Sequence, residues 1–407
     1  MMYAMGTYIS RDVEPVLLEL LEQFPAVAVT GPRQVGKSTL LQQVLPQARY
    51  LTLDDPFLRQ RALDDPELLL EADGRQLIID EIQYAPSLLS YIKMRIDRDR
   101  DRMGAFILTG SQQFPMLKGL GESLAGRIGL LELLPFSMAE SERAGSSPDG
   151  LGAFERACLR GCFPEPLIRG RIDVARWYAS YVQTYLERDI RAIYDIGHLR
   201  EFERCLRLLA ARCSQELHLS SVAAEVGVSA PTIRKWVSVL EASRLIYLLP
   251  PYHRNLGKRT IKAPKLYFLD VGLVCYLTGI RDFGHVMDGP LAGPLFENFG
   301  IQEAVKVSLA QGVQPRFYFL RTQAGLEVDL LVEGVNGRLR PFEFKLARTP
   351  RQNMADALRR FQDQFAALGA EPGQVVTLGE QSGPLTREVG LLSLRSFAAQ
   401  VGELARV

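Results

Sequence analysis

Short apolar runs alternate with helical stretches along the first third of the chain. The runs cover residues 26–30, 49–53, 77–80, 105–109 and 128–134. Runs of this length read as buried strands, and strands that alternate with helices are typical of a parallel sheet. The pattern therefore predicts an N-terminal α/β domain over residues 1 to about 140, with its ligand-binding loops at the carboxyl ends of the strands.

The pattern becomes helical in the middle of the chain. A turn-rich stretch at residues 144–150 precedes helical periodicity from about 151 to 213. Residues 214–249 then predict a helix-turn-helix, in which Ser229 caps a second helix that has Pro231 in its first turn.

Two further segments follow this helical pair. The apolar stretch 245–249 and the basic segment 252–265 resemble the strands and the wing of a winged helix. After a Gly/Pro-rich turn, a helical segment at 295–305 leads into three runs with strand character, at 316–321, 327–333 and 339–345. The C-terminal part is therefore expected to be a second α/β domain.

These changes of pattern predict four domains. They are an α/β domain (1–145), a helical region (146–213), a winged-helix domain (214–284) and a C-terminal α/β domain (285–407).

The segment GPRQVGKS, from Gly31 to Ser38, lies between the first apolar run and a helical stretch. This is the setting of a phosphate-binding loop, in which backbone N–H groups cradle phosphates. Lys37 would reach the β- and γ-phosphates of a bound nucleotide, and Ser38 would hold Mg²⁺. A chance glycine turn is the alternative. The expected nucleotide-binding residues are Gly31, Pro32, Arg33, Gln34, Val35, Gly36, Lys37, Ser38, Thr39 and, from a later strand end, Ser111.

Two acids end the third apolar run. Asp80 would orient the Mg²⁺ shell, and Glu81 would polarise the attacking water. The next run ends in small polar residues, of which Thr109 or Ser111 would bond the γ-phosphate or the water. Simple turn residues at a strand end are an equally good interpretation.

A set of acids and a lysine marks the C-terminal domain. Period-2 alternation places Glu343 and Lys345 on one strand face, where Asp329 from the neighbouring strand can meet them. Together with Glu297, the carboxylates would hold Mg²⁺ or Mn²⁺, and Lys345 would orient a water or stabilise phosphate charge. The alternative is a salt-bridged strand pair without catalysis.

Charge is almost balanced over the 407 residues, with 48 Lys and Arg against 47 Asp and Glu, so any affinity for nucleic acid must come from local patches. Between Arg234 and Lys265 there are eight basic residues and one acid. This excess predicts a DNA-binding face, whereas a protein-docking module is the alternative. The residues expected to face DNA are Thr232, Arg234, Lys235 and Ser238 on the helix and Arg254, Lys258, Arg259 and Lys262 on the wing.

The remaining composition is that of an ordinary globular protein. No apolar run approaches the roughly 20 residues of a membrane span, so we expect a cytoplasmic protein with no membrane partner. The five cysteines lack Cys-x-x-Cys spacing, which favours reduced thiols.

The C-terminal quartet of Glu297, Asp329, Glu343 and Lys345 resembles the site of the PD-(D/E)XK nuclease superfamily. The chain as a whole resembles prokaryotic AAA-family ATPases with a C-terminal domain of unknown function that has a nuclease-like core. The segments that carry this second resemblance are Gly31–Ser38, Leu77–Glu81, Leu108–Ser111, Ser123–Arg127, Tyr185–Ile190 and Leu295–Asn298.

The resemblance to AAA ATPases implies ATP binding and hydrolysis, an adenine preference, action on DNA and a homo-oligomer. It makes Arg127 a candidate finger that reaches a neighbouring subunit's γ-phosphate, although an arginine that neutralises a strand start fits equally well. Arg188 would be a nucleotide sensor or a member of a local ion pair.

Three functions stay open from the sequence. The first is an ATP-driven machine that remodels or moves along DNA. The second is a nucleotide-gated scaffold that docks protein partners, and the third is a metal-dependent nuclease regulated by ATP.

Overall fold

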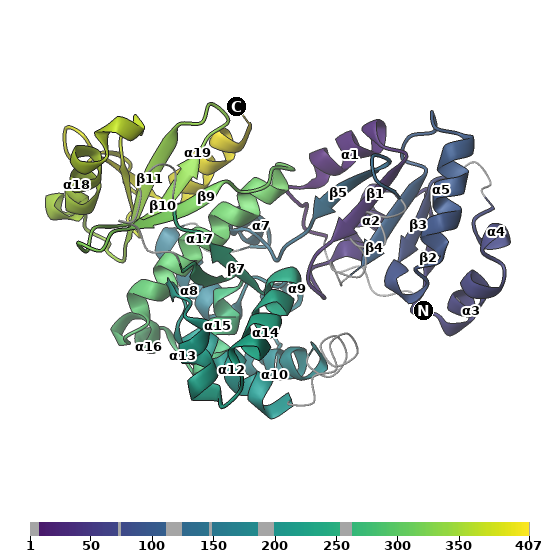
Figure 1. Ribbon diagram of the computed structural model, residues 1–407, viewed down its shortest axis with the longest axis horizontal. Coiled ribbons are helices and arrows are strands. Elements are labelled where there is room, and N and C mark those ends of the chain that lie inside the picture. Colours follow the sequence, from purple (N-terminus) through teal and green to yellow (C-terminus); the bar gives the residue numbers. More distant parts are fainter. Residues whose placement is uncertain are drawn as a thin grey trace. The chain divides into compact units, whose positions relative to one another are not determined.

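The computed structural model describes residues 8–71, 75–110, 124–145, 149–185, 199–252 and 263–406 (Figure 1). Two compact units make up the chain. The first runs to Pro135 and includes residues 242–244, and the second comprises the rest of the chain. Each unit is described by itself below.

The first unit is built on a five-stranded parallel sheet in the order β2-β3-β4-β1-β5. Every residue of β1, β3 and β4 is buried, which explains their uninterrupted apolar sequences. The predicted parallel α/β domain is therefore confirmed. The strands are β1 (Ala26–Thr30), β2 (Arg49–Thr52), β3 (Leu77–Asp80), β4 (Phe106–Gly110) and β5 (Ile128–Glu132).

Helices between the strands cover the sheet. The last of them is amphipathic and buries Leu88, Leu89, Ile92 and Ile96 in the core of the unit. The helices of this unit are α1 (Glu14–Gln23), α2 (Lys37–Val44), α3 (Pro56–Asp64), α4 (Pro66–Leu69), the short 3₁₀ turn η1 (Ile82–Tyr84) and α5 (Leu88–Arg98).

The second unit begins with the helical middle part that the sequence predicts. Its first helices are α7 (Met138–Arg143), α8 (Gly150–Arg160), α9 (Pro164–Ile168), α10 (Val174–Tyr185) and α12 (Leu199–Ala211). The expected helix-turn-helix follows as α13 (Leu219–Val226) and α14 (Ala230–Ala242). Ser229 Oγ accepts a hydrogen bond from the Thr232 N–H at 3.2 Å, which is the predicted cap.

Three short antiparallel strands accompany α13 and α14 in the order β6-β8-β7. They are β6 (Gln215–Glu216), β7 (Ile246–Leu249) and β8 (Lys265–Phe268). The helices α15 (Val271–Thr278) and α16 (Phe283–Asp288) follow. The expected wing at 253–262 lies outside the described residues.

A mixed six-stranded sheet forms the C-terminal part, in the order β13-β14-β12-β11-β10-β9. Strands β9 to β11 are antiparallel, whereas β11, β12 and β14 are parallel. Its elements are α17 (Ala292–Ala310), β9 (Phe317–Arg321), β10 (Glu327–Glu333), β11 (Leu339–Lys345), η4 (Gln352–Ala355), α18 (Asp356–Gln364), η5 (Ala366–Leu368), β12 (Gln374–Thr377), β13 (Gly383–Pro384), β14 (Gly390–Ser393) and α19 (Leu394–Arg406).

The middle and C-terminal parts of the second unit are joined by backbone contacts. Phe319 of β9 donates its N–H to the Pro250 carbonyl at 3.1 Å and accepts the Tyr252 N–H at 2.8 Å. The buried side chain of Asn298 on α17 bonds both the N–H and the carbonyl of Phe268, at 2.8 and 2.7 Å. These contacts hold β9 beside the segment that follows β7, and α17 against β8.

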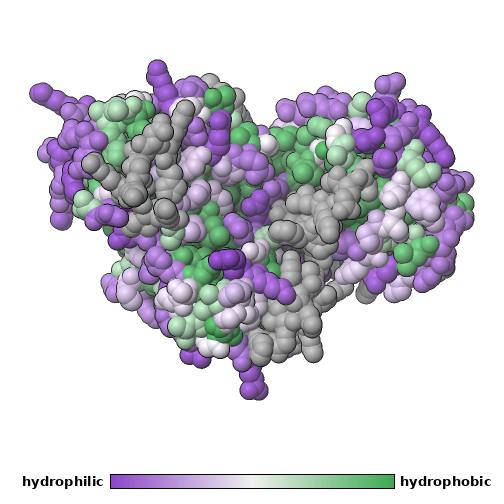
Figure 2. Space-filling view, viewed as in Figure 1, coloured by the Kyte–Doolittle hydropathy of each residue, from purple (hydrophilic) through white to green (hydrophobic). Residues whose placement is uncertain are grey.

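On the face shown in Figure 2, hydrophobic residues form scattered patches between hydrophilic ones. Among the described helices, none combines the length and apolar character needed to cross a lipid bilayer.

Candidate functional site

The phosphate loop follows β1 and ends at α2, as predicted. Gly36 caps the helix with φ of 90°, and Gln34 has φ of 62°. A side chain at Gly31 would place its Cβ 2.0 Å from the Leu133 carbonyl oxygen, so only glycine fits there. The loop therefore turns tightly before the first N–H groups of α2, which have no partners within the helix.

Lys37 lies in the mouth of this loop and is 6% exposed. Its Nζ donates to the carbonyls of Gly31 at 3.0 Å and Pro32 at 2.8 Å. Arg11, which the sequence analysis missed, donates to the carbonyls of Val35 at 2.9 Å and Leu134 at 2.7 Å. A buried arginine thus braces the loop from the N-terminal segment.

Three hydroxyl groups converge on the Asp80 carboxylate at the carboxyl end of β3. Ser38 Oγ donates to its two oxygens at 3.1 and 3.0 Å, so the structure brings together the two residues expected to hold Mg²⁺. The Tyr50 and Thr109 hydroxyls donate to the same carboxylate. Burial, followed by the charge and hydrogen bond of Asp80, raises the pKa of Tyr50 well above its usual value.

Glu81 follows with φ of 58° and ψ of 48°, a left-handed conformation that costs a non-glycine residue about 1–3 kcal/mol. Its N–H donates to Thr109 Oγ1 at 3.2 Å, and its carboxylate accepts a hydrogen bond from the Gln83 amide. The half-buried side chain is held at the same sheet edge as Asp80.

Thr109 contacts both acids at the end of β3. It is fully buried, and its hydroxyl joins Asp80 to the Glu81 backbone. Ser111, the other candidate for bonding the γ-phosphate or the water, lies outside the described residues. Pro32, Arg33 and Val35 complete the loop, and Thr39 is exposed in the first turn of α2.

Replacing Thr109 with valine is expected to lower ATP turnover about tenfold, because a bond to a charged carboxylate is worth roughly 1.5–3 kcal/mol. The Mg²⁺ concentration for half-maximal turnover should also rise. Thr278→Val is the matched control, since that hydroxyl bonds only carbonyls of its own helix, with Val274 at 2.8 Å. Equal turnover and Mg²⁺ dependence in both variants would contradict a positioning role for Thr109.

Arg127 immediately precedes β5, at the edge of the parallel sheet opposite the phosphate loop. Its Nε lies 2.8 Å from Asp97 Oδ1, and hydrogen bonding by Arg127 lowers the pKa of that carboxyl. The residue therefore does not serve the phosphate loop of its own subunit. Arg188 lies outside the described residues.

The exposed side of α14 carries Arg234, Lys235 and Ser238, as expected, with Thr232 half-buried at its start. Two other cations between Arg234 and Lys265 do not belong to an exposed basic surface. Arg244 belongs to the first unit and pairs there with Glu132 at 2.6 Å, and Lys265 is only 2% exposed. Arg254, Lys258, Arg259 and Lys262 lie outside the described residues.

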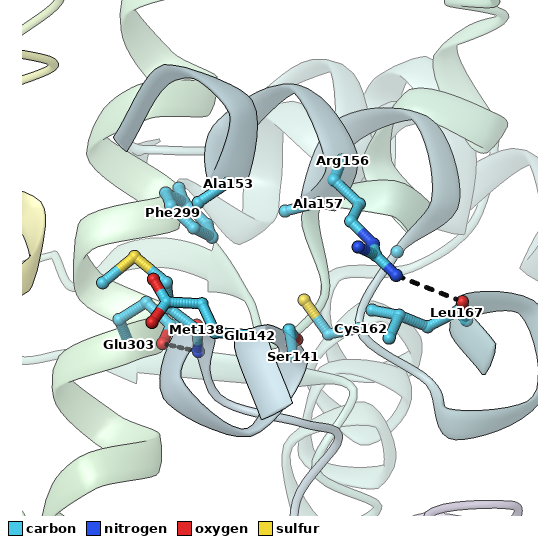
Figure 3. Close-up of a pocket in the computed structure, with 11 residues that line it drawn as sticks. Met138, Ser141, Glu142, Ala153, Arg156, Ala157, Cys162, Leu167, Phe299 and Glu303 are labelled. Carbon is cyan, nitrogen blue, oxygen red and sulfur yellow. Dashed lines mark hydrogen bonds between the residues drawn. The ribbon is translucent and has the colours of Figure 1, made fainter. Parts of the chain in front are cut away.

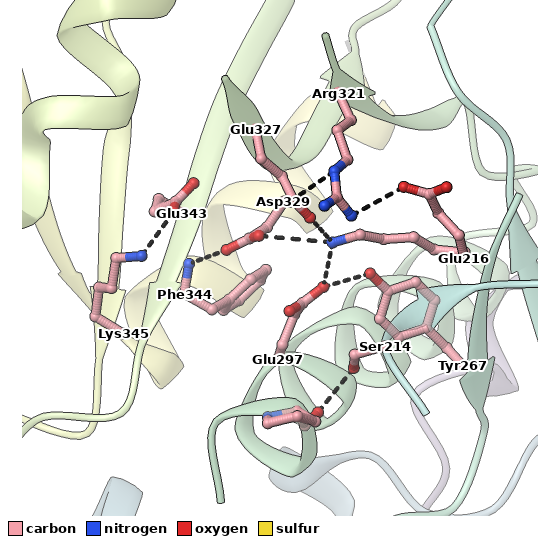
Figure 4. A network of polar contacts seen from close by, with 12 residues as sticks. Ser214, Glu216, Tyr267, Glu297, Arg321, Glu327, Asp329, Glu343, Phe344 and Lys345 are labelled. Carbon is pink, nitrogen blue, oxygen red and sulfur yellow. Dashed lines mark hydrogen bonds and ion pairs between the residues drawn. The ribbon is translucent and has the colours of Figure 1, made fainter. Parts of the chain in front are cut away.

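The four residues of the C-terminal quartet lie in one neighbourhood, but their side chains bond separate partners (Figure 4). Lys345 Nζ pairs with Glu343 Oε1 at 2.7 Å, while Asp329 Oδ2 accepts the Phe344 N–H at 2.9 Å. Glu297 Oε1 accepts the Tyr267 hydroxyl at 2.5 Å and the ammonium of Lys265 at 2.9 Å. Within the described ranges, no group of three or more His, Cys, Asp or Glu side chains is arranged to hold a metal ion.

Burial dominates the electrostatics of these acids. It raises the pKa of Glu297 to about 7 and that of Glu343 to about 8, with the Asp329 charge adding to both shifts. Glu343 Oε2 is buried and has no hydrogen-bond partner among the described residues. The sequence analysis missed Lys265, although the alternation of Lys265 and Tyr267 along one strand face is a visible signal for an inward-facing pair.

A small cavity lies between α7, α8 and α17 (Figure 3). Its volume is about 10 Å³, which leaves no room for an organic substrate. Beside it, Glu303 accepts the Met138 N–H at 2.6 Å, so the side chains here serve to connect segments of the unit.

Family models match three parts of the chain. An AAA domain matches residues 23–142, a domain of unknown function (DUF8612) matches 151–283, and a second domain of unknown function (DUF4143) matches 292–397. The chain is 33% identical over 354 residues to the uncharacterized proteins Rv2008c of Mycobacterium tuberculosis and Mb2031c of Mycobacterium bovis. The match covers 86% of this chain and 76% of theirs.

Solved structures show weaker similarity. The Walker-type ATPase PABY2304 of Pyrococcus abyssi is 16% identical with a TM-score of 0.43, over 66% of this chain and 96% of its own. The Holliday junction branch migration motor RuvB of Thermotoga maritima is 19% identical with a TM-score of 0.31, over 59% of this chain and 89% of its own. Both scores are below 0.5.

Proposed function

Because the chain belongs to the family of these mycobacterial proteins, with an AAA P-loop ATPase domain and two C-terminal domains of unknown function, we propose that it binds and hydrolyses Mg²⁺-ATP and uses this reaction to act on DNA. The helix-turn-helix would provide the DNA contact, within the expected domain at 214–284.

The observation that carries the ATPase proposal is the contact between Ser38 and Asp80 beside the N-terminus of α2. Hydroxyl and carboxylate oxygens are the hard ligands that Mg²⁺ prefers, and helix N–H groups favour phosphate. Bound Mg²⁺ would neutralise charge on the phosphates. Lys37 would exchange its two loop carbonyls for phosphate oxygens.

The acids at the end of β3 take separate roles. Asp80, held by three hydroxyls, fixes the metal side of the site. Glu81 is the proposed residue that polarises the attacking water, and the Gln83 amide bonds its carboxylate. Thr109 couples the two positions, because one hydroxyl bonds both.

We further propose that Arg127 acts on the nucleotide of a neighbouring subunit in a homo-oligomer. Arg127 precedes β5, at the ends of the strands opposite its own phosphate loop, so it would act in trans and would have to release Asp97. An arginine of this kind would stabilise charge that develops during phosphoryl transfer.

The DNA proposal is tested by ATP turnover with no DNA and with single-stranded, duplex and branched DNA. We expect stimulation by at least one DNA, and less stimulation in Arg234→Ala/Lys235→Ala with unchanged basal turnover. The double variant should also lower the salt slope of DNA binding by about 2, since each phosphate contact contributes roughly 0.9.

Arg169→Ala/Arg171→Ala is the control, because it removes two exposed cations outside the helix-turn-helix. Turnover that no DNA alters, together with no DNA binding at low salt, would refute the DNA role and leave the ATPase proposal intact.

One observation favours the scaffold alternative. With Lys265 buried and Arg244 paired, the described part of the basic stretch presents only Arg234 and Lys235 to solvent. A surface with so little charge suits a protein partner as well as DNA. Nucleotide-dependent association with a protein, without DNA-stimulated turnover, would distinguish this function.

A further inference from the structure

Lys265 is a buried cation that no motif explains. It is the first residue of β8, the central strand of the three-stranded sheet, and its side chain is 3% exposed. A buried ammonium is expensive unless carboxylates compensate it. The partners of Lys265 therefore reveal its role.

Three carboxylates from the C-terminal part surround this ammonium. Lys265 Nζ lies 2.6 Å from Glu327 Oε1, 2.9 Å from Glu297 Oε1 and 3.7 Å from Asp329 Oδ1. Glu297 comes from α17, and the other two come from β10. The lysine thus connects three elements of the second unit from a single point.

The cluster keeps the lysine charged. Burial alone would lower the pKa of Lys265, but Glu297, Asp329 and Glu327 together raise it well above its usual value. The neighbouring Tyr267 hydroxyl occupies Glu297 Oε1 as well, and Asp329 Oδ2 is taken by the Phe344 N–H. Glu297 and Asp329, two of the three acids expected to hold a metal ion, are therefore already bonded within the protein.

We infer that the ammonium of Lys265 fills the place of a divalent cation in the nuclease-like site. This site consequently holds no Mg²⁺ or Mn²⁺ and does not cleave nucleic acid by metal catalysis. Its function is to fasten β8 to α17 and β10. Glu343, the third acid of the quartet, is held by Lys345 through Oε1.

The emptied position should bind metal. In Lys265→Ala, three carboxylates would ring a cavity in place of one ammonium, which is a donor set that suits Mg²⁺ or Mn²⁺. We expect this variant to melt several degrees below wild type without metal and to regain part of the loss with Mn²⁺. The measurement uses nucleotide-free protein that also carries Asp80→Asn, so that Mn²⁺ binding at the proposed ATP site does not contribute.

Lys306→Ala is the matched control, since Lys306 is equally buried but has one carboxylate partner, Glu303 at 3.1 Å. Its loss of stability should not respond to Mn²⁺. A folded Lys265→Ala that gains nothing from Mn²⁺ would overturn the inference.

If Lys265→Ala does not fold, Mn²⁺ binding to protein that retains Lys265 tests the inference. In the Asp80→Asn variant, we expect calorimetry to detect no saturable Mn²⁺ binding. Binding that is present there and is lost when Asp329→Asn is added would overturn the inference. The inference does not rest on the proposed ATPase or DNA roles, so these experiments can fail without affecting them.

Discussion

Replacing Lys37 with alanine is expected to reduce ATP turnover by at least about a hundredfold, which is the usual effect of removing one group that stabilises transition-state charge. The Lys37 ammonium lies inside the phosphate loop, where it bonds the Gly31 and Pro32 carbonyls. Phosphate oxygens are its natural replacement partners when a nucleotide binds. Phosphate release under saturating ATP measures the effect.

Lys93→Ala provides the control for this loss, because it removes a lysine from α5 of the same unit. Its turnover should equal that of wild type, and both variants should melt like wild type. A Lys37→Ala protein that is folded and hydrolyses ATP at the wild-type rate would refute the assignment of the phosphate loop.

Replacing Glu303 with alanine is expected to lower the free energy of unfolding by about 3–5 kcal/mol, the usual cost of leaving one member of a buried ion pair alone. Glu303 and Lys306 are 2% and 4% exposed and lie 3.1 Å apart on α17. The Lys306 ammonium also donates to the Phe136 carbonyl at 2.9 Å, so it cannot reach water. The urea midpoint of the second unit reports the change.

The double variant Glu303→Leu/Lys306→Met should be less destabilised than Glu303→Ala, because no unpaired charge remains buried. Glu142→Ala serves as a control, since its pair with Arg395 is partly exposed and should contribute less than about 1 kcal/mol. A double variant that is less stable than the single one would show that packing, and not charge, determines the effect.

The phosphate loop and the acid beside it could be predicted, the first from a continuous sequence motif and the second from the way parallel strands end at one edge of a sheet. Gly31 to Ser38 lie together in sequence, and parallel strands bring Asp80 to the same sheet edge. The AAA domain and the C-terminal domain of unknown function that the resemblance implied are confirmed by the family models. The nuclease resemblance and the domain boundaries stay predictions.

Contacts between distant segments could not be predicted in the same way. The pairing of β3 with β4 brings the Thr109 hydroxyl to Asp80, a contact that the sequence does not reveal. Tyr50 and Arg11 were missed because neither lies in a motif. Each of these hydrogen bonds depends on strand register and on the direction of one side chain.

The sequence by itself determined the parallel α/β domain, the phosphate loop and the positions of the helix pair and of strands β9 to β11. Periodicity and short motifs encode these features, because hydrophobic burial and turn geometry act over a few residues. Only the tertiary structure decided which charged side chains are buried and which groups they contact. Lys265 counted as part of a basic surface in the chain, but folding places it among Glu297, Glu327 and Asp329. The energy of a charge depends on its burial and on its neighbours in space, and neither is written in the local sequence.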